Sequence, residues 1–289
     1  MLVRGSPDPQ LSARVVATRP LAGVRAGSGL VQLVERLLVV QDDAFAIAWV
    51  DLATFDVRVV PLRGDGAALP KLEKPDFEAA AADTDGSVWL FGSGSTPRRC
   101  ALGRVDVDGG AVTIHERPEL YDAVSVAAEL EGRPNVEAAV IDRDALHLFH
   151  RGAGARPSAM ISLALSALEG AAPVVIDRRT FDLGALDGVP LSFTDATMVG
   201  QTTFFLAAAE VTDNAIDDGR VVGSVLGWLG RESAAWTPLV DQDGRPIACK
   251  AEGLAVDEDL RGAWAITDPD DAAAPALLLR IALDGFTVR

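Results

Sequence analysis

Four segments of the chain begin alike and recur at nearly equal intervals. Each segment contains one acidic residue, and successive acidic residues are separated by 59, 58 and 57 positions; they are Glu78, Glu137, Asp195 and Glu252. A fixed period of this size indicates one structural unit that is copied several times along the chain. If the copies surround an axis, their acidic residues meet near its centre.

Short apolar runs within each copy predict the type of unit. A run rich in aromatic and β-branched residues follows each acidic residue after a polar turn; the runs are Ser87–Phe91, Ala145–Phe149, Thr202–Leu206 and Gly262–Ile266. Strand, polar turn and strand predict a β-hairpin. Further runs continue the copies, at Ala101–Val105, Ala159–Leu163, Val222–Leu226 and Ala276–Ile281, and again at Ala111–Ile114 and Pro173–Ile176. Four short strands per copy are the anatomy of a β-propeller blade.

The predicted fold is therefore all-β, a single β-propeller domain that spans residues 1–289. A degenerate copy lies upstream at Arg36–Val40, Ala46–Val50 and Val57–Val60, with Gly27 in place of the acidic residue. Five blades of four antiparallel strands fit the period of the repeat, and six shorter blades stay open as an alternative.

Two further expectations concern the connections of the fold. The last copy is short, so the N-terminal run Leu11–Ala17 is expected to supply its outer strand and close the ring. Helical patterns are weak, and Glu116–Glu131 and Ser162–Glu169 are expected to be loops with at most short helical turns.

Charge and composition limit the partners. The net charge is −16, which argues against nucleic acid, whose affinity depends on Lys and Arg, and against anionic membranes. The start of the chain has no apolar signal segment and no run is long enough for a membrane span, so a cytoplasmic location is expected. The two cysteines, Cys100 and Cys249, fit no zinc motif. A small-molecule ligand is compatible with these features, and the sequence does not indicate a protein partner.

The first strand of each blade lines the central channel of a propeller, so Glu78, Glu137, Asp195 and Glu252 are candidate ligands for calcium or another divalent metal. Carboxylates this close repel one another unless a cation compensates them. Lys74, Arg133 and Lys250 precede three of the acids and could also do this. The alternative is therefore a structural role, in which the acids cap backbone N–H groups or pair with Lys and Arg.

A second set of residues lies where the second strand of each copy ends. Repeats keep structural residues alike, yet these ends differ from copy to copy: Gln41–Asp43, Gly92–Ser95, His150–Gly152, Glu210–Thr212 and Thr267–Asp271. Glu210 and Asp268 are candidate catalytic bases, and Arg151 is a candidate for holding an anionic group.

Other polar residues near these strand ends have structural or functional interpretations of their own. Asp213, Asp217 and Asp218 are interpreted as a solvated loop, His147 as a strand residue, and His150 as a residue that can reach the channel mouth. The segment Gly92–Arg99 either cradles an anion or forms a tight loop with solvated arginines.

At these residues the chain resembles a family of uncharacterised bacterial β-propellers, and more loosely the esterase-like phytase and SMP-30/gluconolactonase propellers. The matching pieces are Lys74–Ala79 with Gly92–Ser95, Asn135–Glu137 with Leu148–Gly152, Thr194–Ala196 with Ala207–Glu210, and Lys250–Ala255 with Thr267–Asp271. The resemblance implies a propeller with an acidic centre that binds calcium. Lactonase propellers hold a divalent ion with Glu, Asn and Asp; Glu78 or Glu137 with Asn135 and Asp195 could imitate that set, although in a different order and spacing.

Two functions follow from these patterns. In the first, the protein is a metal-dependent hydrolase of phosphate esters, esters or lactones, with a divalent ion on the four central acids that activates water. In the second, it is a non-catalytic propeller that binds a small molecule or a protein, with its central acids paired to Lys and Arg. The sequence leaves open whether the protein is an enzyme.

Overall fold

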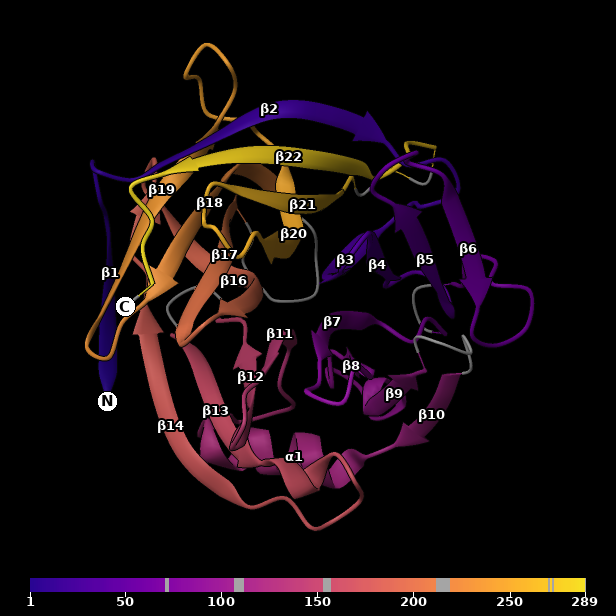
Figure 1. Cartoon of the computed structure of the whole chain (residues 1–289). Coiled ribbons are helices and arrows are strands. Elements are labelled where there is room, and N and C mark those ends of the chain that lie inside the picture. Colours follow the sequence, from indigo (N-terminus) through magenta and orange to yellow (C-terminus); the bar gives the residue numbers. More distant parts are fainter. Residues whose placement is uncertain are drawn as a thin grey trace.

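A computed structural model describes residues 1–70, 73–106, 112–152, 157–211, 219–269, 271 and 273–288. Nearly all of its regular structure is β-strand (Figure 1). Among these residues no helix is long and apolar enough to cross a membrane.

The strands form antiparallel groups of four, each a meander in which consecutive strands pair. From the inner to the outer strand, the groups are β3 (Gly27–Leu33), β4 (Arg36–Gln41), β5 (Ala46–Asp51) and β6 (Val57–Pro61); β7 (Phe77–Ala82), β8 (Val88–Gly92), β9 (Ala101–Val105) and β10 (Val112–Glu116); β11 (Val136–Ile141), β12 (Ala145–His150), β13 (Ser158–Ala164) and β14 (Val175–Asp182); β16 (Val189–Val199), β17 (Thr202–Val211), β18 (Arg220–Leu229) and β19 (Ser233–Val240); and β20 (Lys250–Val256), β21 (Gly262–Asp268) and β22 (Leu277–Asp284), completed by β2 (Ser12–Pro20). A two-residue strand, β15 (Ala185–Leu186), pairs with the start of β16.

The inner strands surround a common centre, and the outer strands lie at the rim (Figure 1). β3 contacts β7, β7 contacts β11, β11 contacts β16, β16 contacts β20, and β20 returns to β3. These contacts close the groups into a ring, the arrangement that a propeller requires.

Buried apolar side chains fill the space between neighbouring groups. Each adjacent pair of groups shares one apolar cluster, and the clusters follow one another around the ring. Phe193 on β16 is fully buried, and its ring meets those of Phe149, Phe181 and Phe205 edge to face at centroid distances of 5.2, 5.2 and 5.4 Å. Such pairs stabilise beyond the burial of their area, so this cluster fastens β11–β14 to β16–β19.

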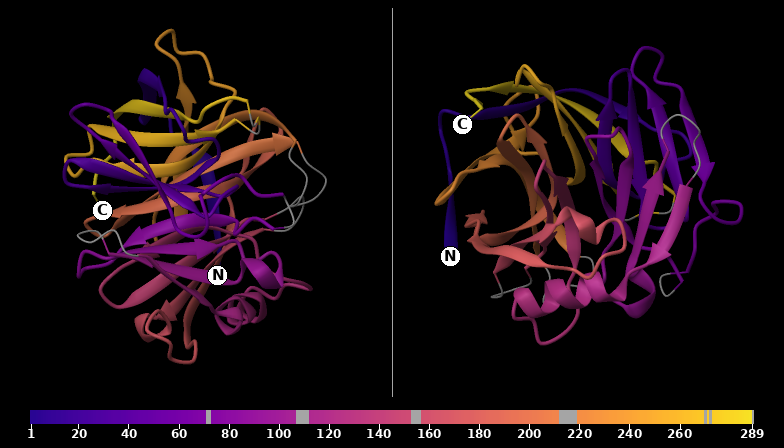
Figure 2. Two further views of the ribbon diagram at one scale, coloured as in Figure 1. Left: turned by 90° about the vertical axis from the view of Figure 1, so that its right-hand side faces the viewer. Right: turned by 60° about the horizontal axis from the view of Figure 1, so that its bottom comes forward.

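The first strands of the chain lie on the outside of the ring (Figure 2). β1 (Leu2–Pro7) runs parallel between β14 and β19, so it joins two neighbouring sheets. β2 pairs with β22 over eight register positions, from Ser12 opposite Asp284 to Pro20 opposite Leu277. The N-terminal run thus supplies the fourth strand that the last copy lacks, and it covers an edge that would otherwise be open.

The prediction of a loop over Glu116–Glu131 is wrong, because α1 occupies Pro118–Ala127. Proline at the first helical position suits a helix start. Leu120, Tyr121 and Val124 are fully buried between the β7–β10 and β11–β14 sheets, and the Tyr121 hydroxyl donates to the carbonyl of Ala101 at 2.8 Å. Tertiary packing therefore stabilises a helix that the mixed sequence pattern does not indicate. In the other predicted loop, β13 continues to Ala164 and a 3₁₀ turn covers Leu165–Ala167.

Candidate functional site

Every inner strand of the ring carries a β-bulge, which lies near the start of four strands and in the middle of β16. The bulge leaves one residue out of the pairing with the second strand, and the omitted residues are Ser28, Glu78, Glu137, Thr194 and Glu252. A bulge bends its strand and re-aims the side chain of the extra residue. The repeated unit therefore presents one chosen side chain per copy at the same level of the ring.

The bulges correct the alignment of the copies by one residue in two places. The structure places Thr194, rather than Asp195, in register with the three glutamates, and Ser28, rather than Gly27, in the upstream copy. The Ser28 hydroxyl donates to the carbonyl of Phe77 at 2.5 Å, and the Thr194 hydroxyl donates to the carbonyl of Ala251 at 2.6 Å. Each acceptor precedes a bulged glutamate of the next sheet, so these two hydroxyls link neighbouring sheets.

Asp195 forms another link between inner strands. Its carboxylate accepts the backbone N–H of Ala196 at 2.8 Å and that of Leu254 on β20 at 2.6 Å. Burial raises the pKa of Asp195 well above its usual range, although both N–H groups oppose that shift. Both carboxylate oxygens of Asp195 are thus engaged by backbone, and the carboxyls of Glu252 and Glu137 raise its pKa further.

Arg151 joins two of the predicted site residues. Its guanidinium lies 3.6 Å from Glu137 Oε1 and donates from Nη2 to Glu210, which comes from the neighbouring sheet. Asn135 Nδ2 also donates to Glu137, at 2.6 Å, and the Gly219 N–H donates to Glu210 at 2.5 Å. Burial raises the pKa of Glu137 despite Arg151, whereas Arg151 and the Gly219 N–H outweigh burial and lower the pKa of Glu210.

Glu252 has its own cationic partner. Lys250, two residues earlier on β20, places Nζ 2.6 Å from Glu252 Oε1. Burial still raises the pKa of Glu252 well above its usual range, and the carboxylates of Asp268 and Glu137 raise it further. Asp268 therefore lies close enough to act on Glu252.

A cluster that the sequence analysis did not single out lies around Glu78. Carboxylate oxygens of Asp42, Asp76 and Glu78 all lie within 4.8 Å of one another. Lys74 pairs with Asp42 and lies 3.2 Å from Asp76, and Arg99 lies 2.8 Å from Asp76. We call Asp42, Asp76 and Glu78 the carboxyl triad.

Burial and mutual repulsion shift the pKa values of the carboxyl triad and of Lys74. Burial raises the pKa of Asp42 to about 6 although Lys74 opposes it. Burial also raises the pKa of Glu78 well above its usual range, and the Asp76, Asp42, Glu137 and Glu252 carboxyls add to the shift. The same carboxylates raise the pKa of Lys74 against the effect of its burial. Carboxyls from three other sheets, those of Asp42, Glu137 and Glu252, thus act on Glu78. The glutamates of different copies therefore do lie near one another.

Two positional signals could have identified the triad. Asp76 lies two residues before its bulge, as Asn135 and Lys250 do, and Asp42 directly follows β4 as Arg151 follows β12. In contrast, Glu210 lies two residues beyond its own register position, which Ala208 occupies. β17 is longer than the other second strands, so it carries Glu210 out to the same region by a different route.

The remaining sequence candidates have partners of their own. Within Gly92–Arg99, Arg99 and the Ser93 hydroxyl both contact Asp76. The anionic group that this loop binds is therefore a carboxylate of the same chain. Gly94 has φ +73°, and a Cβ there would lie 2.2 Å from the Tyr121 ring, which explains the glycine. Arg133 lies 3.7 Å from Asp122 rather than beside Glu137.

His147 and His150 both have hydrogen-bond partners. The buried His150 accepts the Asn135 N–H at 2.9 Å, beside the site, and His147 bonds to Ser162 and Asp142. Asp213, Asp217 and Asp218 lie outside the described residues.

The other end of the channel differs in chemistry. A cavity of about 900 Å³ lies along the later parts of the inner strands, and small apolar residues such as Ala80, Ala139 and Ala255 line it. Val288, near the C-terminus, also lines this cavity. Buried ion pairs thus gather toward the starts of the inner strands, whereas small apolar side chains, together with Asp257 and Glu258, line the cavity at their ends.

The raised pKa values predict how stability depends on pH. The folded protein holds protons on Asp42 and Glu78 that the unfolded chain has lost, so the stability from these carboxyls falls as pH rises through the folded-state pKa. For Asp42 this window runs from 3.8 to about 6. Glu78→Gln mimics the protonated form, so its thermal midpoint should fall less between pH 5 and pH 8 than that of the wild type. An identical fall in both proteins would contradict the shifted pKa, and Asp243→Asn, at an exposed carboxylate, serves as control.

Most of the chain matches one protein family. The profile of a family of unknown function, DUF6929, matches residues 23–283. The chain belongs to this family. The match agrees with the predicted resemblance to a family without a known activity. Among curated protein sequences none matches the chain.

Solved structures similar to this DUF6929 protein support the fold. Glutaminyl cyclase from Myxococcus xanthus has a TM-score of 0.56 at 10% identity, over 98% of this chain and 99% of that one. The PQQ-bound aldose sugar dehydrogenase from Streptomyces coelicolor has a TM-score of 0.54 at 12% identity, over 96% of this chain and all of that one. A luciferin-regenerating enzyme is also similar, with a TM-score of 0.48 at 12% identity, over 96% and 98% of the two chains. Both structures with the higher scores are β-propellers, so the chain has a β-propeller fold. At these identities the likeness concerns the fold alone.

Proposed function

We propose that this protein is a five-bladed, single-domain propeller that binds, without a catalysed reaction, a small molecule with an ammonium or guanidinium group at the charged end of its channel. Five copies of the bulged inner strand support the blade count over the six-blade alternative, since the described residues contain no sixth inner strand. The exclusion of nucleic acid and anionic membranes as partners stays a prediction from the net charge of −16.

One observation carries the binding proposal: carboxyls outnumber their cationic partners at the channel mouth. Lys74, Arg99, Arg151 and Lys250 face Asp42, Asp76, Glu78, Glu137, Glu210 and Glu252. Glu78 lies beside two other carboxyls, and it shares the positive charge of Lys74 with them. Such a site is compensated by protons in its free form and by a cationic group in its bound form.

The ion pairs favour binding over hydrolysis. Glu137, Glu210 and Glu252 each have a Lys or Arg partner, and Asp195 is held by backbone. Three of the four carboxyls that were predicted to hold a divalent ion, Glu137, Asp195 and Glu252, are thus engaged in separate contacts, and the fourth, Glu78, lies in the carboxyl triad. A ligand that brings one positive charge needs to displace only protons from Glu78 and Asp42.

The proposal predicts a pH-dependent response to simple cations. n-Butylammonium and methylguanidinium should raise the thermal midpoint of the wild-type protein through mass action, and more so at pH 8 than at pH 5, because they compete with protons. Glu78→Gln should abolish the response, whereas the exposed Asp243→Asn should keep it. The absence of a shift with either cation, or an unchanged shift in Glu78→Gln, would refute the proposal.

A second candidate is a divalent-metal-dependent hydrolase, because three carboxylate oxygens within 4.8 Å of one another could share an ion. The fit is incomplete, because Lys74 already contacts two of the three carboxylates. An ion would have to displace Lys74, so Lys74→Met should strengthen calcium binding if the triad is a metal site. A calcium-dependent rise in the thermal midpoint that grows in Lys74→Met, with EDTA-sensitive ester hydrolysis, would favour this candidate over the first.

A further inference from the structure

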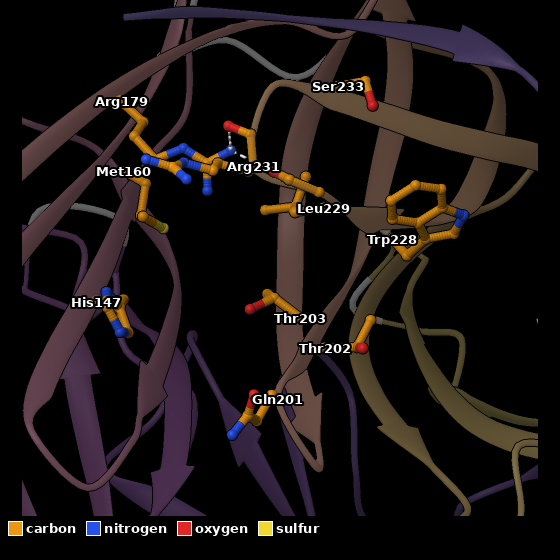
Figure 3. Close-up of a pocket in the computed structure, with 11 residues that line it drawn as sticks. His147, Met160, Arg179, Gln201, Thr202, Thr203, Trp228, Leu229, Arg231 and Ser233 are labelled. Atoms are coloured by element: carbon orange, nitrogen blue, oxygen red, sulfur yellow. Dashed lines mark hydrogen bonds between the residues drawn. The ribbon is translucent and has the colours of Figure 1, made fainter. Parts of the chain in front are cut away.

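A second cavity lies between the sheet β11–β14 and the sheet β16–β19, away from the carboxyl triad. It measures about 600 Å³, within the size range of small-molecule sites. His147, Met160 and Arg179 lie on one side of it, and Gln201, Thr203 and Leu229 face them from the other sheet (Figure 3). The cavity therefore has walls from two sheets, as many binding sites do.

The charge of this cavity is opposite to that of the protein. Arg179 and Arg231 line it, and within the described part of the chain no carboxylate does. The net charge of the whole chain is −16. The two arginines of the lining, of which Arg231 is exposed, concentrate positive potential at one place in this acidic protein.

Arg179 is only partly satisfied by the protein. Its Nη2 donates to the backbone carbonyls of Gly230 and Arg231, the latter at 2.9 Å (Figure 3). Its Nε is buried, and no hydrogen-bond partner for it occurs among the described residues. A buried N–H without a partner is costly, so the contacts within the protein do not use all the donors of Arg179.

The rest of the lining combines hydrogen-bonding and apolar groups. Thr203, Ser233 and Gln201 can donate or accept, while Met160 and Leu229 supply apolar surface. Both ring nitrogens of His147 already bond to Ser162 and Asp142. Its imidazole therefore lines the cavity without offering a free hydrogen-bonding group to a ligand. We infer that this cavity binds a small organic anion, a carboxylate joined to a flat apolar group, with the carboxylate at Arg179 and Arg231.

Benzoate and its neutral analogue benzamide test this inference by isothermal titration calorimetry on the full chain. Benzoate should bind about tenfold more tightly than benzamide, because charged hydrogen bonds to arginine are stronger than neutral ones. Arg231→Gln should reduce that preference, and Arg179→Lys, which keeps the charge but loses the planar guanidinium fork, should weaken benzoate binding by about tenfold. Arg245→Gln, at an exposed arginine, is the matched control.

Several outcomes would overturn the inference. They are equal affinity for benzoate and benzamide, no binding of benzoate, binding of inorganic phosphate but not of benzoate, and benzoate affinity that neither arginine variant changes. If Arg179→Lys does not fold, Thr203→Val provides the second variant and should weaken benzoate binding. Glu78→Gln should leave benzoate binding unchanged, which separates this cavity from the channel mouth.

Discussion

Replacing Arg151 with Met is expected to lower the free energy of unfolding by about 3–5 kcal/mol, the usual cost of removing one partner of a buried charged pair. Arg151 is 9% exposed and lies between Glu137, at 4%, and Glu210, at 8%. Without the guanidinium, two buried carboxyls face each other unpaired or must take up protons. Urea denaturation at pH 7 measures the loss.

Two controls separate this charge effect from a loss of packing. Arg245 pairs with Asp243 on the surface, and Arg245→Met should cost less than about 1 kcal/mol. Adding Glu137→Gln and Glu210→Gln to Arg151→Met should recover much of the stability, because the carboxyls that needed the guanidinium are then neutral. A loss near that of the surface variant would show that Arg151 does not compensate these two groups.

Phe193→Ala is expected to cost about 3–5 kcal/mol, the range for removing a large aromatic side chain from a core. The Phe193 ring contacts three other phenylalanine rings between two sheets, so the surrounding side chains cannot readily fill the space. Chemical denaturation measures the change, and Val126→Ala, at a side chain that is 79% exposed on α1, should cost little. A cost below about 1 kcal/mol would mean that the sheets do not share this core.

The strands were predictable because their signals are local. Ala101–Val105 coincides with β9, and the run at Arg36–Val40 lies within β4. Alternating apolar residues between polar turns predict a strand without any knowledge of its neighbours. α1 was missed because its stability depends on contacts with other segments, such as the bond from Tyr121 to Ala101.

The site was only partly predictable, because a β-bulge has no sequence signature of its own. The period of the repeat led to Glu78, Glu137 and Glu252, but it could not distinguish Thr194 from Asp195 at the fourth bulge. Nor could it pair Arg151 with Glu210, since 59 residues separate them and the longer β17 sets their contact. Asp42 and Asp76 were missed because each is one of several acids beside a strand end, and only the register shows that they meet Glu78.

The most direct test of the account is the pKa of Glu137, measured by side-chain carbon NMR in the wild type and in Lys250→Met. Glu137 lies on β11 and Lys250 on β20, which are neither consecutive in the chain nor paired in a sheet. Because Lys250 lowers the pKa of Glu137 across the channel mouth, the pKa should lie above the usual glutamate value in the wild type and rise further in Lys250→Met. An ordinary pKa that Lys250→Met leaves unchanged would show that the charged residues of different copies do not meet at one centre.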